Sequence, residues 1–283
     1  MKITNNQKLP DALVQAISTN RHNEKGCYSA TTLLHGSTET ILTERHFDEI
    51  EVDAADSIWQ VFGTATHSIF EKQNDNSFKE ESFSVQVSNS KVTGRVDAYN
   101  LETETIIDWK TASVWKIQFA DFDDWKKQGL IYAWLLKQSG LSVKRCEFIA
   151  LLKDHSKSKA RNDASYPQSP VYKYAFDVTD ADLEEIERFI KGKIAELEEA
   201  EKLADWEIKP CSNEERWASG EKWAVMKTGR KTAIKLFDDE KTANEMMSKL
   251  GGTYVEHRPA ESRKCLDYCT VCKWCPFWQS MNK

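Results

Sequence analysis

The sequence GRVDAYNLETETIIDWKT, residues 94–111, predicts two antiparallel β-strands joined by a polar turn at residues 100–104. Side chains two positions apart on a strand share a face, so Asp108 and Lys110 point the same way. Folding about the turn brings Asp97, on the preceding strand, to within about a position of Asp108. Two carboxylates and one ammonium group are therefore expected on one patch of a sheet otherwise rich in Ile and Val.

These three charges point to a metal-assisted reaction. Burying them is unfavourable unless something compensates, and a divalent cation held by Asp97 and Asp108 would do so. Carboxylate oxygens suit Mg²⁺ or Mn²⁺, which activate water and polarise a phosphate. Lys110 could then orient the nucleophile or stabilise growing negative charge. The pattern predicts phosphodiester hydrolysis, and an ordinary Asp–Lys ion pair at a sheet edge is the alternative.

Apolar periodicity around these strands predicts an α/β core with a mixed sheet. Residues 1–26 predict no firm element, and residues 153–170 predict a polar loop. The expected order is helices, three strands, a helix, two strands and a long acidic helix capped by Thr179. The expected ranges are helices at 31–44, 53–72, 121–138 and 180–201, with Asp121 or Asp123 as an N-cap, and strands at 83–87, 92–99, 105–111, 143–152 and 171–178.

Three further polar side chains accompany the charged strands. His67 closes the stretch Gly63–His67 on a predicted helix, and a neutral imidazole there could be a ligand that favours Mn²⁺. Gln128 and Tyr132 are four residues apart and share a helix face. From that face an amide and a phenol could reach a DNA phosphate or Lys110. Taken alone, His67 is more simply explained as an ordinary helix histidine, and the alternative for Gln128 and Tyr132 is a polar pair on a packed helix.

The order G-x-x-x-H, V-D, D-x-K and Q-x-x-x-Y resembles the RecB-like branch of the PD-(D/E)xK nuclease superfamily over residues 28–180. The resemblance implies a restriction-endonuclease-like core, with a central mixed sheet flanked by helices. Asp108 departs from the many members that have Glu, and its shorter arm could alter metal preference. Glu81, just before the first predicted strand, is a further acid that could face the site, although a solvated surface acid is the favoured interpretation. The roles implied are metal binding by His67, Asp97 and Asp108, catalysis by Asp97, Asp108 and Lys110, and DNA binding by Gln128 and Tyr132.

Four of the seven cysteines crowd together as Cys265-x3-Cys269-x2-Cys272-x2-Cys275. We expect a cytoplasmic protein, where reducing conditions argue against a disulfide framework. Thiolates at this density predict a bound metal or cluster, and four thiolates satisfy zinc as well as iron–sulfur. Spacing alone does not decide between the two metals.

The family resemblance favours the iron–sulfur alternative. RecB-like relatives, including the AddAB nuclease subunit and CRISPR adaptation nucleases, can hold a [4Fe–4S] cluster on three C-terminal cysteines and one remote cysteine. Cys27 competes with Cys211 for the remote position, and Cys272 could instead complete the set. The ligand set implied by the resemblance is Cys211, Cys265, Cys269 and Cys275.

The sequence pattern changes after Pro210. A hairpin at 223–237, a helix at 238–250 and a strand at 253–258 predict a small C-terminal ββαβ module. We therefore expect two domains: a nuclease core with N-terminal helices at 1–210, and the module with its cysteine-rich metal clip at 211–283.

Composition limits the remaining function classes. The 283 residues carry a net charge of −6, which excludes a globally basic nucleic-acid coat but not a local basic patch. No apolar stretch is long enough to span a membrane, and residues 1–10 are polar and contain no signal sequence.

The leading hypothesis is a metal-dependent DNA exonuclease of phage recombination or processing, acting on DNA with free ends beside a recombination or helicase partner protein. The alternative is a DNA-end-binding or CRISPR-adaptation-type processing factor within a larger complex. A protein built only around a structural metal clip would leave Asp97, Asp108 and Lys110 unexplained.

Overall fold

A computed structural model describes residues 1–17, 24–73 and 77–281. The chain divides into two compact units, Met1–Ala204 and Asp205–Lys283. These units are defined by contacts alone. The assignment of a nuclease core to the first part of the chain and of a metal-bearing module to the second stays a prediction.

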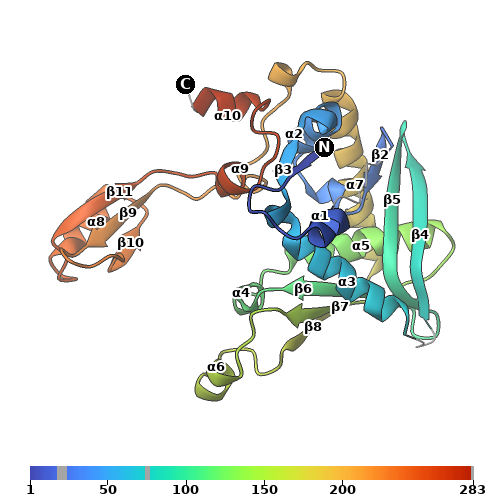
Figure 1. The fold of residues 1–283 in the computed structure, drawn as a ribbon, viewed down its shortest axis with the longest axis horizontal. Coiled ribbons are helices and arrows are strands. Elements are labelled where there is room, and N and C mark those ends of the chain that lie inside the picture. The colour runs from blue at the N-terminus through green and yellow to red at the C-terminus, as the bar shows by residue number, and fades with distance from the viewer. Residues whose placement is uncertain (18–23, 74–76, 282–283) are drawn as a thin grey trace. The chain divides into compact units, whose positions relative to one another are not determined.

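The first unit is built on a six-stranded sheet, with strand order β2-β5-β6-β7-β8 and β4 paired to β5 (Figure 1). The β4 and β6 strands run antiparallel to β5, whereas β2 runs parallel to it; β7 is parallel to β6, and β8 is antiparallel to β7. The predicted α/β class with a central mixed sheet is therefore confirmed. The strands are β2 (Cys27–Ser29), β4 (Ser77–Val87), β5 (Ser90–Asn100), β6 (Thr105–Ala112), β7 (Arg145–Leu152) and β8 (Val171–Asp177).

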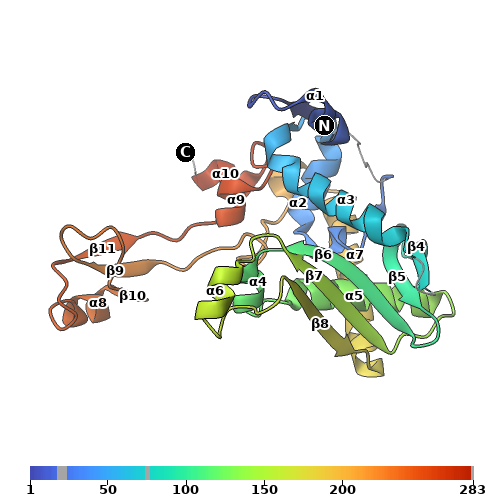
Figure 2. The same ribbon diagram turned by 60° about the horizontal axis from the view of Figure 1, so that its bottom comes forward.

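Helices flank the sheet, as predicted. Phe70 of α3 (Ile58–Glu71) stacks on Trp109 with ring centroids 4.0 Å apart, whereas Gln128 of α5 (Asp123–Gln138) binds Lys110. Because Trp109 and Lys110 are consecutive on β6, they point to opposite faces, and the two helices cover the two faces of that strand (Figure 2). The α7 helix (Asp180–Ala200) packs on α5 and on α2 (Ser37–Arg45), and its Thr179 forms the predicted cap as part of a capping box.

Gly94, at the start of the opening motif, allows α5 to lie directly on β5. A Cβ atom at this position would come within 2.6 Å of Leu135 Cδ1 and 3.0 Å of the Tyr132 ring. Only a residue without a side chain permits this approach. The close contact brings the helix face that carries Gln128 and Tyr132 onto the charged strands.

Several short elements differ from the sequence prediction. The prediction of no firm element in residues 1–26 is wrong, because β1 (Lys2–Thr4) pairs with β3 (Glu51–Asp53) and α1 follows at Asp11–Ile17. The Asp53 carboxylate holds this arrangement by accepting from Thr4 Oγ1 and from the backbone of Asn6. Such a pairing across distant segments leaves no periodicity in either segment.

Two short helices follow the ends of β6 and β7 and are also absent from the prediction. The α4 helix (Val114–Gln118) is capped by Ser113, and α6 (Lys157–Asn162), capped by Ser156, occupies the stretch predicted to be a loop. The α5 helix begins at Asp123 with Phe122 as its N-cap, so the predicted aspartate cap is wrong. One-turn 3-10 helices complete the unit at Thr32–Leu34, Phe47–Glu49 and Ala54–Ser57.

The second unit contains a three-stranded antiparallel sheet in the order β10-β9-β11. Helix α8 lies between β10 and β11 in the chain and packs against all three strands. The elements are the 3-10 turn Asp205–Glu207, β9 (Lys222–Met226), β10 (Lys235–Phe237), α8 (Glu240–Met247), β11 (Tyr254–Arg258), α9 (Arg263–Asp267) and α10 (Pro276–Met281). Within the residues described above, no helix is both long and apolar enough to cross a membrane.

Candidate functional site

The antiparallel register of β5 and β6 sets the two aspartates of the opening motif against each other. Ala98 pairs with Ile107 and Tyr99 with Ile106, so the same register carries Asp97 to a position opposite Asp108. Both carboxylates are buried, and the Trp109 backbone N–H donates to Asp97 Oδ2 at 2.8 Å. The turn between the strands thus produces the pairing of acids that the sequence predicts.

A continuous polar chain leads from Asp108 to helix α5. Lys110 Nζ lies 2.7 Å from Asp108 Oδ2 and donates to Gln128 Oε1 at 2.9 Å. Gln128 Nε2 donates in turn to the Tyr132 hydroxyl at 2.9 Å. The Lys110 ammonium also lies 5.5 Å from the centroid of the Phe148 ring. Gln128 was expected to contact either a DNA phosphate or Lys110, and the structure shows the contact with Lys110.

His67 and an unpredicted acid, Glu80, approach Asp97 from the other side. His67 Nδ1 lies 3.1 Å from Asp97 Oδ1. Glu80 of β4 lies opposite Asp97, between the pairs Lys79–Ala98 and Glu81–Val96. His67, Glu80 and Asp97 each offer one possible metal-ligand atom, and these three atoms all lie within 4.8 Å of one another.

Glu80 was missed because the sequence predicts a strand only from residue 83, whereas β4 begins at Ser77. Glu81, at the neighbouring position, is exposed, as expected for the solvated acid that was the favoured interpretation. Extending the antiparallel register backwards from Phe83 would have placed Glu80 opposite Asp97. Glu80 also has a φ of 54°, an uncommon conformation for a non-glycine residue, and pairs with Arg95 Nε at 2.5 Å.

Burial and mutual repulsion disfavour the negative charges of this cluster. Burial raises the pKa of Asp108 to about 6, and Lys110 partly opposes the shift while Asp97 adds to it. Burial also raises the pKa of Glu80, and the hydrogen bond to Asp97 raises the pKa of His67. Among the described side chains, Asp108 Oδ2 is buried and accepts no hydrogen bond of ordinary geometry, although Lys110 pairs with it as an ion.

These observations fit a divalent cation. The two carboxylates of Glu80 and Asp97 and the imidazole of His67 form an oxygen-rich donor set of the kind that suits Mg²⁺ or Mn²⁺. A dication would offset the effect of burial, and the smaller effect of the Asp97 charge, that raise the pKa values of Asp108 and Glu80. His67, Glu80 and Asp97 form one compact group, and Asp108 lies next to this group without belonging to it. The three lie in a cavity of about 950 Å³, whose wall also includes Gly94 and Tyr132.

The cost of the buried Asp108 charge gives a test of this electrostatic account. We expect Asp108→Asn to stabilise the metal-free protein by about 1–2 kcal/mol at pH 8. The pKa of this carboxyl is raised to about 6 from 3.8, so the folded state loses stability as pH rises through that interval. Thermal unfolding in chelator should therefore show the largest gain at pH 8 and little gain near pH 4.

Asp56→Asn is the matched control, because Asp56 is exposed and its replacement should change the unfolding temperature little at either pH. Added Mg²⁺ should stabilise the parent protein more than Asp108→Asn, since a ligand stabilises only the state that binds it. A lower unfolding temperature for Asp108→Asn at pH 8 would contradict the account.

The four C-terminal cysteines interact with one another in the second unit. Cys272 Sγ donates to the Cys265 carbonyl at 3.0 Å, and its hydrogen bond with Cys269 and its burial both raise its thiol pKa. Burial also raises the pKa of Cys265, with the charges of Cys269 and Cys275 adding to the effect. A bound cation would offset the repulsion between these thiolates, so the arrangement is compatible with the predicted metal clip, which stays a prediction.

The two candidates for the remote cysteine ligand lie in different units of the chain. Cys211 belongs to the second unit together with the cluster, whereas Cys27 lies on β2 of the first unit. Cys146 is fully buried in β7.

Comparisons with known proteins give structural matches only. Neither a protein-family model nor a curated protein matches the chain. The solved structure of SSO0001 matches with a TM-score of 0.46 and 17% identity, over 65% of this chain and 83% of that one. The alkaline exonuclease LHK-Exo of Laribacter hongkongensis matches with a TM-score of 0.39 and 14% identity, over 68% and 95% of the two chains.

A phage related exonuclease from Haemophilus somnus matches with a TM-score of 0.35 and 12% identity, over 59% of this chain and 92% of that one. With TM-scores below 0.5, the function of this chain has to be argued from its own residues.

Proposed function

We propose that this protein is a divalent-metal-dependent deoxyribonuclease that hydrolyses phosphodiester bonds as an exonuclease. The observation that supports it most directly is the Lys110 ammonium, held between the buried Asp108 carboxylate and Gln128 beside a second cluster of acids. A structural ion pair needs neither the second buried aspartate nor His67. The choice of DNA ends as the substrate, and of phage recombination or processing as the setting, follows the sequence resemblance.

His67, Glu80, Asp97 and Asp108 would hold the cation. When bound, Mg²⁺ or Mn²⁺ supplies a more acidic water and a polarised phosphate. The Trp109 N–H fixes one oxygen of Asp97, which leaves Asp97 Oδ1 on the side of His67. The backbone therefore orients the Asp97 carboxylate whether or not a cation is bound. Hydrogen bonds of this kind, made to a metal-binding side chain, preserve the geometry of a metal site.

Lys110 provides the positive charge that this reaction needs at the phosphate. Negative charge grows on the non-bridging oxygens during attack, and a fixed ammonium group stabilises it more than mobile water does. Gln128 accepts from Lys110 Nζ, and Tyr132 fixes the Gln128 amide from behind. Gln128 and Tyr132 thus act as positioning residues for Lys110 in this proposal, and Tyr132 also reaches the wall of the cavity.

We further propose that Cys265, Cys269 and Cys275, with Cys211 as the fourth ligand, hold a [4Fe–4S] cluster. The mutual contacts of the C-terminal thiols support a metal site, and the family resemblance favours iron–sulfur over zinc. Cys272 lies in contact with the same thiols and is the competing fourth ligand.

Metal dependence is the experiment that tests the proposed activity. Linear end-labelled DNA should be degraded in Mg²⁺ or Mn²⁺, whereas closed circular DNA should stay intact. Calcium should support DNA binding without turnover. It binds the same oxygen ligands as Mg²⁺, but its coordination geometry is looser and does not hold the reacting groups in place.

Two outcomes of this experiment contradict the proposal. Cleavage that continues undiminished in excess chelator would exclude the proposed metal chemistry. Binding of DNA ends without any cleavage would favour the end-binding factor that acts within a larger complex.

A further inference from the structure

Two large aromatic side chains stand exposed on α4, immediately after the strand that carries Asp108 and Lys110. Trp115 and Phe119 are 62% and 73% exposed, and their rings stack with centroids 5.6 Å apart and planes 19° apart. Leaving two stacked rings in water forgoes burial worth about 1.5–3 kcal/mol for a side chain such as Phe. An exposed apolar pair of this kind marks a binding surface.

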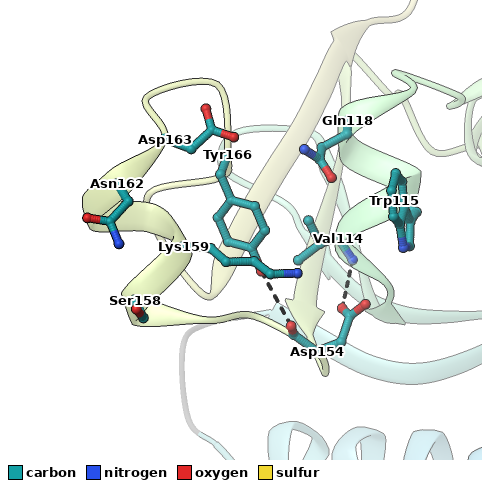
Figure 3. A pocket seen from close by; sticks show the side chains of 9 residues that line it. All are labelled: Val114, Trp115, Gln118, Asp154, Ser158, Lys159, Asn162, Asp163 and Tyr166. Carbon is teal, nitrogen blue, oxygen red and sulfur yellow. Dashed lines mark hydrogen bonds between the residues drawn. The ribbon is translucent and has the colours of Figure 1, made fainter.

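Trp115 also forms part of a separate pocket of about 430 Å³ between α4 and α6 (Figure 3). The pocket combines one further ring, Tyr166, with the amide of Gln118 and the ammonium group of Lys159. Lys159 extends across the pocket beside Tyr166, with its Nζ 5.9 Å from the ring centroid. Flat rings, an amide and a cation are the groups that bind a base and its phosphate.

The pocket is held in shape by hydrogen bonds within its own walls. Asp154 accepts from the Val114 backbone N–H at 2.8 Å and from the Ser113 hydroxyl at 2.7 Å, which ties α4 to the end of β7. The Tyr166 hydroxyl accepts from the Ser156 backbone N–H at 2.9 Å, which ties the end of the α6 segment to its start. A preformed pocket loses little entropy on binding.

The pocket is continuous along the chain with the proposed catalytic cavity. Thr111 lines the cavity, and Val114 lines the pocket. Three residues of extended chain span about 10 Å, which is the rise of about three nucleotides at 3.4 Å each. A second link is Trp59 of the cavity wall, because Lys153 Nζ lies 4.0 Å above its ring and Lys153 directly precedes Asp154 of the pocket.

We propose that the pocket between α4 and α6 binds one nucleobase of the DNA strand, a few nucleotides from the bond that is cut. The base stacks on Trp115, Gln118 meets its polar edge, and Lys159 contacts the adjacent phosphate. This inference rests on the proposed nuclease function, and it adds a positioning site that sets how the strand lies across the catalytic residues.

The first test measures affinity for a fluorescently labelled single-stranded oligonucleotide of about 12 nucleotides, by anisotropy in calcium buffer. Trp115→Ala should weaken binding by about fivefold or more, the loss expected for one stacked base. Trp115→Phe keeps an aromatic face and should stay within about twofold of the parent. Leu101→Ala is the control, because Leu101 is an apolar side chain 49% exposed in the turn between β5 and β6 and should have no effect.

The second test moves a single abasic site along the oligonucleotide. In the parent protein, an abasic site at one position of the oligonucleotide should weaken binding by about fivefold. In Trp115→Ala, an abasic site at that same position should weaken binding no further, since the ring and the base interact only with each other. This non-additivity is a readout that a merely structural role of Trp115 does not produce.

The outcomes separate this inference from the proposed function. If the parent protein cleaves DNA, but Trp115→Ala binds as tightly as the parent or no abasic register is special, the pocket does not bind a base and the nuclease function stands. If the parent protein neither binds nor cleaves DNA in any metal, the proposed function fails and this inference fails with it.

Discussion

Replacing Lys110 by Ala is expected to lower the rate of DNA cleavage by about 100- to 1,000-fold, with DNA affinity in calcium within about threefold of the parent. A preorganised cation that stabilises developing charge is worth about 3–4 kcal/mol in the transition state, and a loss of 1.36 kcal/mol is tenfold in rate. Because Lys110 is held by Asp108 and Gln128 in the absence of substrate, its contribution falls mainly on the chemical step.

The measurement is a single-turnover digestion of end-labelled linear DNA in Mg²⁺, together with anisotropy in calcium. Loss of Lys110 leaves the buried Asp108 charge without its cation, so thermal unfolding must accompany the rates. Lys110→Met is the second variant, because it keeps an unbranched side chain beside Phe148 and removes only the charge. Lys91→Ala, on an exposed position of β5, is the control and should cleave normally. A fully active Lys110→Ala protein would remove the catalytic assignment.

Replacing Cys269 or Cys275 by Ser is expected to release the bound metal and to destabilise the second unit by several kcal/mol. Metal-thiolate sites contribute on the order of 10 kcal/mol to folding, since the unfolded chain has no preformed site. Cys275 is buried, and all four cysteines from Cys265 to Cys275 lie within the short segment that contains α9 and α10. Nuclease chemistry should change less than stability in whatever protein folds.

Iron and zinc analysis of anaerobically purified protein, with an absorbance spectrum and thermal unfolding, measures this effect. The parent protein should be brown and should contain iron. Cys272→Ser should be the mildest change if Cys211 completes the ligand set, and Cys211→Ser the mildest if Cys272 does. Cys27→Ser tests the remaining candidate ligand and should retain the metal if Cys211 completes the set.

Two results would revise this assignment to different degrees. One zinc ion and no iron would keep the metal clip and remove the iron–sulfur cluster. Neither metal, together with four cysteines that react freely with thiol reagents in the folded protein, would remove the clip altogether.

Local sequence was sufficient for most of the sheet and for part of the site. The β5 and β6 strands alternate apolar and polar residues and are joined by one short turn, so their register, with Asp97 opposite Asp108, follows from neighbouring residues. Gln128 and Tyr132 lie on one helix face for the same local reason, a spacing of four residues. Capping chemistry likewise placed the start of α7 at Thr179.

The tertiary structure alone decided the rest. Glu80 joins His67 and Asp97 because β4 continues six residues before its predicted start, through a Ser, Lys and Glu-rich segment whose strand conformation comes from pairing with β5. The β1–β3 pair and the pocket between α4 and α6 likewise join segments that are about 40 residues or more apart. Sequence periodicity reports how one element faces the core, whereas contacts between distant elements depend on the packing of the whole chain.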